Sequence, residues 1–160
     1  MTPSPRRTLG FTLVELIVVI LLLGILSAYA ASRYSGTSSV AALTTQQEIL
    51  ASLRLTQNRA MQRTGFCNRW LATANQAGQI SPQAVAGSCS SIFAAVDNDI
   101  SRVEALSGVT LSLSTPNGYL DFDSLGRAAQ CTALPCTITI SSAHDQRQVC
   151  INTEGYIYAC

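Results

Sequence analysis

The chain has 160 residues, a length that suits one domain with a modest hydrophobic core. Its 10 basic and 9 acidic residues leave a net charge of only +1, which excludes a global field that would attract nucleic acid. Apolar residues make up 48% of the chain and charged residues 12%, a balance too apolar for intrinsic disorder.

Much of the apolar excess lies near the N-terminus. Between residues 11 and 31 the only charged residue is Glu15, and a run of about twenty apolar residues can cross a bilayer as a helix. Arg6 and Arg7 precede this run and Arg33 follows it, and the paired arginines favour an N-terminus that stays in the cytoplasm. The sequence therefore predicts a membrane anchor with the rest of the chain on the exported side.

A polar leader gives way to the apolar run at Gly-Phe-Thr-Leu-Val-Glu-Leu, residues 10–16. Gly10 has no side chain, so a protease can approach the backbone closely. An ionised Glu15 in hydrocarbon costs roughly 2.5–3.5 kcal/mol, which indicates a functional residue with a partner elsewhere. The segment resembles the type IV prepilin signal. This resemblance implies cleavage between Gly10 and Phe11 by prepilin peptidase, N-methylation of Phe11 and a role for Glu15 in filament assembly.

The same resemblance implies an organisation and a set of partners. Residues 1–10 are the leader peptide, and residues 11–33 are the transmembrane half of a long helix. In the filament, Glu15 of one subunit can pair with the Phe11 amine of a neighbour, because opposite charges attract strongly in a low dielectric and each is penalised alone. The expected partners are the lipid bilayer, the peptidase, an inner-membrane assembly platform and other pilins or pseudopilins.

Two simpler interpretations of the N-terminus remain open at this point. An ordinary secretory signal would use Ala28-Tyr29-Ala30 as its cleavage site, although a glutamate fits the start of its apolar region poorly. A plain single-pass anchor would be better served by leucine than by Glu15.

The helix is expected to continue beyond the membrane as far as Gly65, a good stop signal, since no proline interrupts residues 11–65. In residues 34–65, apolar side chains recur at spacings that place them on one face, for packing on a sheet. They are Ala42, Leu43, Ile49, Leu50, Leu53, Ala60 and Met61.

Residues 66–160 are expected to form a β-rich globular head. Residues 66–91 are rich in glycine and small polar side chains and predict a loop, with Trp70 packed beneath it. Residues 97–106 are expected to form a short helix capped by Asp97 or Asn98. Alternation then predicts four or five antiparallel strands. They are residues 109–113, 119–123, 137–141, 147–151 and 155–159, the last two joined by a tight turn.

A long helix followed by a small antiparallel β-sheet is an α+β fold, and with the N-terminal motif it is similar to the ladle of type IV pilins. The pattern in residues 122–126, 137–140 and 155–157 resembles, more weakly, the head of H-type pseudopilins and FimT-like minor pilins. The six-cysteine composition is similar to minor pilins of mannose-sensitive haemagglutinin-type pili.

The six cysteines all follow the apolar run, which indicates disulfides formed in an oxidising compartment. Many full pairings are possible, and we favour the local ones. These are Cys67–Cys89, Cys131–Cys136 and Cys150–Cys160. The third is the least favoured, because a tight hairpin would place Cys150 nearer Ile157. Buried free thiols remain the alternative, whereas wide spacing and an isolated His144 argue against zinc.

Other chemistry finds little support. Residues 97–99 open like a calcium loop but lack its glycine and closing glutamate. His144-Asp145 has no nucleophile elbow, so no enzyme is expected. No phosphate loop or dinucleotide fingerprint is present, and neither a cofactor nor a metal is expected. Phosphate binding needs clustered basic residues, which makes nucleic acid an unfavoured partner of the scattered arginines in the exported part. Those arginines are Arg69, Arg102, Arg127 and Arg147.

The predicted function is therefore structural. The chain is expected to be a minor pilin or pseudopilin of a type IV pilus or type II secretion-like filament. It is first anchored in the inner membrane with its head in the periplasm, and later enters the filament. A major pilin or adhesive subunit is the alternative within this class, and a DNA-binding minor pilin of a DNA-uptake pilus is the alternative from another class.

Overall fold

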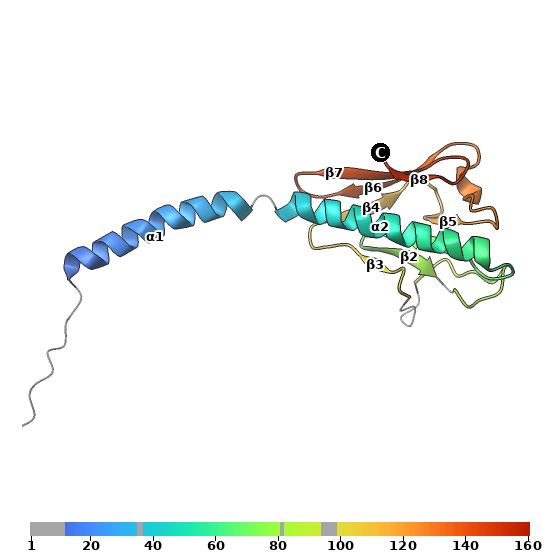
Figure 1. Ribbon diagram of the computed structural model, residues 1–160, viewed down its shortest axis with the longest axis horizontal. Helices are drawn as coiled ribbons and strands as arrows, with labels where there is room; N and C mark the ends of the chain where they lie inside the picture. The colour runs from blue at the N-terminus through green and yellow to red at the C-terminus, as the bar shows by residue number, and fades with distance from the viewer. Residues whose placement is uncertain (1–11, 35–36, 81, 94–98) are drawn as a thin grey trace, which may run out of the picture. The chain divides into compact units, whose positions relative to one another are not determined.

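A computed structural model describes residues 12–34, 37–80, 82–93 and 99–160 and divides the chain into two units, Met1–Gly36 and Thr37–Cys160. The first unit holds α1, and the second holds α2 and the β-rich head (Figure 1). The elements are α1 (Leu13–Tyr34), α2 (Thr37–Gln62), β1 (Arg69–Ala72), β2 (Gln76–Ile80), β3 (Val103–Glu104), β4 (Thr110–Leu113), β5 (Tyr119–Asp121), the 3₁₀ turn η1 (Ala129–Cys131), β6 (Cys136–Ser141), β7 (Gln146–Ile151) and β8 (Ile157–Ala159).

Helical structure covers most of the segment predicted to be one helix. It is described in two parts, α1 and α2, and residues 35–36 between them lie outside the described residues. The helix α2 ends at Gln62, close to the expected stop at Gly65, where the backbone φ is 81°. Glycine enters this left-handed region without the steric cost that a Cβ brings, which explains the end of the helix.

The inward face of α2 is the predicted apolar stripe with two corrections. The buried members are Ala42, Ile49, Leu50, Leu53 and Ala60. Leu43 and Met61 are 42% and 45% exposed, so their assignment to the core was wrong. Adjacent residues on a helix point about 100° apart. Because Ala42 and Ala60 point inward, Leu43 and Met61, which follow them in the sequence, point away from the core. The face is completed by buried polar side chains, namely Thr45, Gln46, Ser52 and Thr56.

The head contains two antiparallel sheets, where one was predicted. One sheet has the order β3-β2-β1-β5 and the other the order β4-β6-β7-β8. The helix α2 lies against both and contacts β1, β2, β3, β6, β7 and β8 (Figure 1). The core fills the space between helix and sheets, with Trp70, Leu120, Ile138 and Ile151 fully buried. The α+β class is confirmed, and β4, β5, β6, β7 and β8 each overlap a predicted strand.

The first sheet holds the main errors of the prediction. Residues 66–91 were expected to form a loop, yet they contain β1 and β2, paired from Arg69↔Ile80 to Ala72↔Ala77. The short helix expected at residues 97–106 is also wrong within the described residues. Arg102 closes a turn onto the Asp99 carbonyl at 2.9 Å, and β3 follows, with Val103 paired to Ala77. Of the apolar residues in the expected helix, Ile100 is 83% exposed, whereas Val103 is buried as part of β3.

The last hairpin is wider than predicted. Ile151 pairs with Ile157, so Cys150 lies opposite Tyr158 and not opposite Ile157. Asn152 holds the turn, because its side-chain Oδ1 accepts hydrogen bonds from the backbone N–H groups of residues 154 and 156. The extra turn residues bring the C-terminal Cys160 diagonally across from Cys150, within reach of a disulfide.

Candidate assembly site and the disulfide-bonded head

Glu15 lies in the first turn of α1, on its exposed surface. Its backbone N–H donates a hydrogen bond of 3.2 Å to the side-chain Oγ1 of Thr12, which therefore caps the start of the helix. A carboxylate three residues after a threonine cap is favoured by the helix dipole. A lipid environment would nevertheless penalise the charge of an ionised Glu15. The predicted cleavage and methylation residues, Gly10 and Phe11, lie outside the described residues.

The helix α1 has the properties of a membrane span. Within α1, the 18-residue stretch Leu13–Ala30 is long and apolar enough to cross a bilayer, and none of this stretch is buried within the structure. Ser27 does not interrupt the span, because its hydroxyl donates to the carbonyls of Leu23 at 2.8 Å and Gly24 at 2.9 Å. Bonding of this kind satisfies a hydroxyl inside hydrocarbon.

Three disulfides tie the head together. They join Cys67 to Cys89, Cys131 to Cys136 and Cys150 to Cys160, which are the pairs expected from the sequence. The joined residues are 22, 5 and 10 positions apart along the chain. No cysteine is left free. Each bond stabilises the head mainly by limiting the unfolded chain, and more so for the longest loop.

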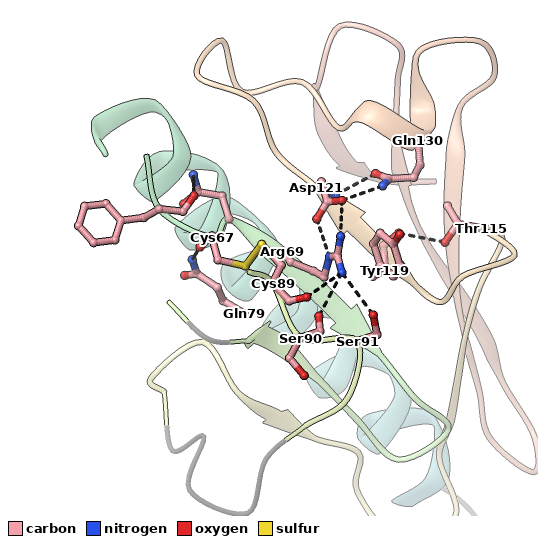
Figure 2. A network of polar contacts seen from close by, with 12 residues as sticks. Cys67, Arg69, Gln79, Cys89, Ser90, Ser91, Thr115, Tyr119, Asp121 and Gln130 are labelled. Carbon is pink, nitrogen blue, oxygen red and sulfur yellow. Dashed lines mark hydrogen bonds and ion pairs between the residues drawn. A yellow bond between two sulfur atoms is a disulfide. The ribbon is translucent and has the colours of Figure 1, made fainter. Parts of the chain in front are cut away.

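A polar network centred on Arg69 lies beside the first of these disulfides (Figure 2). The guanidinium of Arg69 donates to both carboxylate oxygens of Asp121, at 2.7 and 2.8 Å, and its Cζ lies 3.7 Å from the ring centroid of Tyr119. The hydrogen bond to Asp121, opposed by burial, raises the pKa of Arg69. Gln130 holds Asp121 from the other side, donating to Oδ2 at 3.2 Å and accepting from the Asp121 backbone N–H at 2.8 Å. A bidentate, stacked arginine of this kind is fixed in orientation.

A second arginine connects α2 to the first sheet. Arg59 donates through Nη1 to the Gln79 side chain at 2.6 Å and to Asp99 at 2.8 Å. Burial opposes ionisation of Asp99, but the hydrogen bonds from Arg59 and Ser101 outweigh it and lower the pKa of this carboxyl. Gln79 is almost fully buried and donates in turn to the Cys67 carbonyl at 3.1 Å.

Most of the charged side chains that the structure describes in α2 and the head are paired with one another. Five arginines lie within 4 Å of a carboxylate. The pairs are Arg59–Asp99, Arg69–Asp121, Arg102–Glu104, Arg127–Asp123 and Arg147–Asp145. All four arginines weighed for phosphate binding are among them. A phosphate would have to compete with these carboxylates, so the arrangement disfavours nucleic acid. Among the described residues, no three His, Cys, Asp or Glu side chains gather as a metal site.

Comparison with known proteins places this head in a family. Residues 45–155 match the family described as type II transport protein GspH, over well more than half of the chain. The chain belongs to the GspH family. Residues 5–31 also match the prokaryotic N-terminal methylation motif, which covers the prepilin-like segment. This GspH-family chain is therefore a structural subunit of a pilus or pseudopilus, and its apolar N-terminal helix indicates membrane anchoring and assembly with other pilins.

Solved structures share the fold. The type IV minor pilin FimU of Pseudomonas aeruginosa PAO1, in space group P65, matches with a TM-score of 0.54 and 17% identity, over 74% of this chain and 91% of that one. The same protein in space group P21 matches with a TM-score of 0.51 and 13% identity, over 74% and 87% of the two chains. No curated protein sequence matches the chain. At such identities the likeness concerns the fold, and it agrees with the GspH-family head described above.

Sequence reasoning did not find the polar network of this GspH-family head. Arg69 was weighed only as a scattered surface charge, and Asp121 and Gln79 were not singled out. The signal that could have found Arg69 and Asp121 is their direct opposition in the β1–β5 pairing. That pairing was hidden because β1 falls in a segment predicted to be a loop.

Proposed function

We propose that this GspH-family chain is made as a prepilin, cut after Gly10, methylated at Phe11 and held in the inner membrane by residues 11–33 with its head in the periplasm. Residues 34–65 continue as the amphipathic helix half, and residues 66–160 form the disulfide-bonded head. Prepilin peptidase and an inner-membrane assembly platform are the partners that this route requires. The observation that carries the proposal is a capped apolar helix with one acidic residue, Glu15, in its first turn.

Glu15 is the residue on which assembly depends in this proposal. In lipid its carboxylate costs roughly 2.5–3.5 kcal/mol, so it lowers the stability of the anchored subunit. In a filament the methylated amine of a neighbour's Phe11 neutralises it, and the attraction between the two charges rewards one axial register. The head has its own core and belongs to a separate unit, so its folding does not require Glu15.

The experiment separates the charge of Glu15 from its place at the helix start. Glu15→Gln keeps a side chain suited to a capping position and removes the charge, whereas Glu15→Leu removes both. Both variants should be processed, inserted and disulfide-bonded, yet fail to co-purify with other pilins. Ser27→Leu is the matched control in the same helix, because its hydroxyl is already satisfied within α1, and it should co-purify normally.

Two results would overturn the proposal. Normal recovery of partner pilins with Glu15→Gln would show that the charge has no role in assembly. An intact mass that begins at Ala31, and not at methylated Phe11, would show that the N-terminus is a secretory signal. Gly10→Val should block processing, since a branched side chain then stands at the cleavage point.

A further inference from the structure

The segment that carries Cys89 is held in place by a side chain and not only by its disulfide. Figure 2 shows Nη1 of Arg69 directed at the chain on the C-terminal side of Cys89. It donates to the Ser90 carbonyl at 3.2 Å, with longer contacts of 3.4 Å to the Cys89 carbonyl and to the Ser91 hydroxyl. Two of these acceptors are backbone oxygens and none is a sulfur atom. The contacts therefore do not depend on the disulfide being formed.

The remaining donors of Arg69 are used to fix its orientation. Asp121 accepts from Nε and Nη2, and Tyr119 lies under the guanidinium plane. Both partners stand on β5, which pairs directly with β1. The Arg69 side chain is 14% exposed, so it has little freedom to point elsewhere. Folding of the β1–β5 pair thus aims Nη1 at the position that the Cys89 segment takes.

Cys67, the other member of the pair, is held by hydrogen bonds of its own backbone. Its carbonyl accepts from buried Gln79, which Arg59 of α2 binds in turn, and its backbone N–H donates to the Ala84 carbonyl at 2.7 Å. The Cys67 side chain is fully buried. Neither contact of Cys67 involves sulfur, so neither requires the disulfide.

Of the three disulfides, Cys67–Cys89 depends most on a contact that brings its two cysteines together. Cys67 and Cys89 are 22 residues apart, whereas Cys131 and Cys136 are only 5 apart. Loop-closure entropy makes the chance encounter of the distant pair about ninefold rarer than that of the near pair. Reduced Cys89 also has competitors, since four other cysteines are present in the head. A side chain that collects the Cys89 segment raises the effective concentration of the correct pair.

We propose that Arg69 is a positioning residue for disulfide formation, which brings Cys89 to Cys67 before the bond exists and so directs the pairing of the longest cysteine loop. The chemical step needs a disulfide oxidant. One cysteine forms a mixed disulfide with it, the thiolate of the other attacks the protein sulfur of that bond, and the oxidant leaves as two thiols. Two thiols of the chain become one disulfide, and the oxidant takes up two electrons and two protons.

The test is oxidative refolding of the full chain in detergent micelles, from the fully reduced state, with oxidised glutathione as the oxidant. Free thiols are alkylated at successive times, and non-reducing peptide mapping follows each bond separately. In Arg69→Met, formation of Cys67–Cys89 should slow at least about fivefold, as expected for loss of hydrogen bonds to a charged donor. Cys150–Cys160 should form at the wild-type rate, and Cys89 should appear in non-native pairs.

The controls separate positioning from general destabilisation. Arg147→Met removes a similar ion pair, Arg147–Asp145 at 2.9 Å, three residues from Cys150, and should leave all three rates unchanged. Asp121→Asn removes the charge that orients Arg69 and should delay the same bond as Arg69→Met. Arg69→Lys keeps the charge without the planar fork and should restore the rate only in part.

Two outcomes would overturn the proposal. If Arg69→Met forms Cys67–Cys89 at the wild-type rate, the arginine acts only in the finished fold. If all three bonds are delayed together, the variant is generally unfolded and Arg69 has no selective role. Selective delay of the one bond supports the proposal, and it does so whether or not Glu15 proves necessary for filament assembly.

Discussion

Gly155 occupies the most crowded backbone position among the glycines that the structure describes, and replacing it should be costly. Its φ is +89°, and an added Cβ would lie 2.3 Å from the carbonyl oxygen of Gly126. The left-handed conformation alone costs an ordinary residue roughly 1–2 kcal/mol. Overpacking against backbone adds roughly 1–3 kcal/mol. Gly155→Ala should therefore lower the free energy of unfolding by about 2–5 kcal/mol, a large part of the roughly 5–15 kcal/mol that holds a domain folded.

Gly108→Ala is the matched control. Gly108 has a similar φ of +81°, but an added Cβ would meet nothing within 4 Å. Its substitution should cost only the conformational part, about 1–2 kcal/mol. Urea unfolding of the disulfide-bonded chain in detergent, followed by fluorescence of the single, fully buried Trp70, measures both variants. Equal losses in the two variants would refute the close approach of the two glycine turns.

Two further substitutions test polar contacts of the core. Asp99→Asn removes a carboxylate with a shifted pKa. Burial alone would raise the pKa of Asp99, but hydrogen bonds from Arg59 and Ser101 outweigh burial and lower it from 3.8. The ionised carboxylate of Asp99 stabilises the fold at any pH above the pKa that Asp99 has in the unfolded chain. This stabilisation disappears as the pH falls through the pKa that Asp99 has in the folded chain. The difference in unfolding free energy between wild type and variant should thus be constant near neutral pH and shrink below about pH 4; a constant difference at all pH values would contradict this origin. Ser52→Ala leaves the buried Trp70 Nε1–H without its 2.8 Å acceptor and should cost about 1–3 kcal/mol in urea unfolding, and an unchanged midpoint would show that another acceptor takes over.

Periodicity predicted the parts of the fold in which one face meets the core and the other meets water. The strand β6 shows this most clearly, since its residues alternate between buried and half-buried along the whole of Cys136–Ser141. In β2 the pattern fails, because four of its five residues are buried, including Gln79. Gly78 added to the error by suggesting a loop. It is needed within the strand, because a Cβ there would lie 2.9 Å from the Arg102 backbone.

Some of the functional residues could be recognised from local sequence, and others only from the pairing of distant strands. Glu15 could be found from the sequence because its charge stands alone in an apolar run, which is a local property. The disulfide pairs could also be found, because each joins two consecutive cysteines of the sequence. Arg69 and Asp121 are 52 residues apart, and only the β1–β5 pairing makes them opposite residues. Contacts that depend on the pairing of distant strands leave no pattern in a single sequence.

The polar face of α2 gives this helix a fixed position on the sheets. Apolar contacts alone would hold a helix against a sheet with some tolerance for sliding and rotation, because they are not directional. Four side chains of α2 instead donate to backbone carbonyls of separate segments. The donors and acceptors are Gln46 to Gln148, Ser52 to Ser101, Arg54 to Ile157, and Gln57 to both Gly126 and Gly155. A shift of α2 by one residue would break all of these hydrogen bonds together and leave several of the acceptors buried without partners, at about 1–3 kcal/mol each. The polar side chains on the inward side of this helix thus supply directional bonds, which select one register on the head where burial alone would allow several.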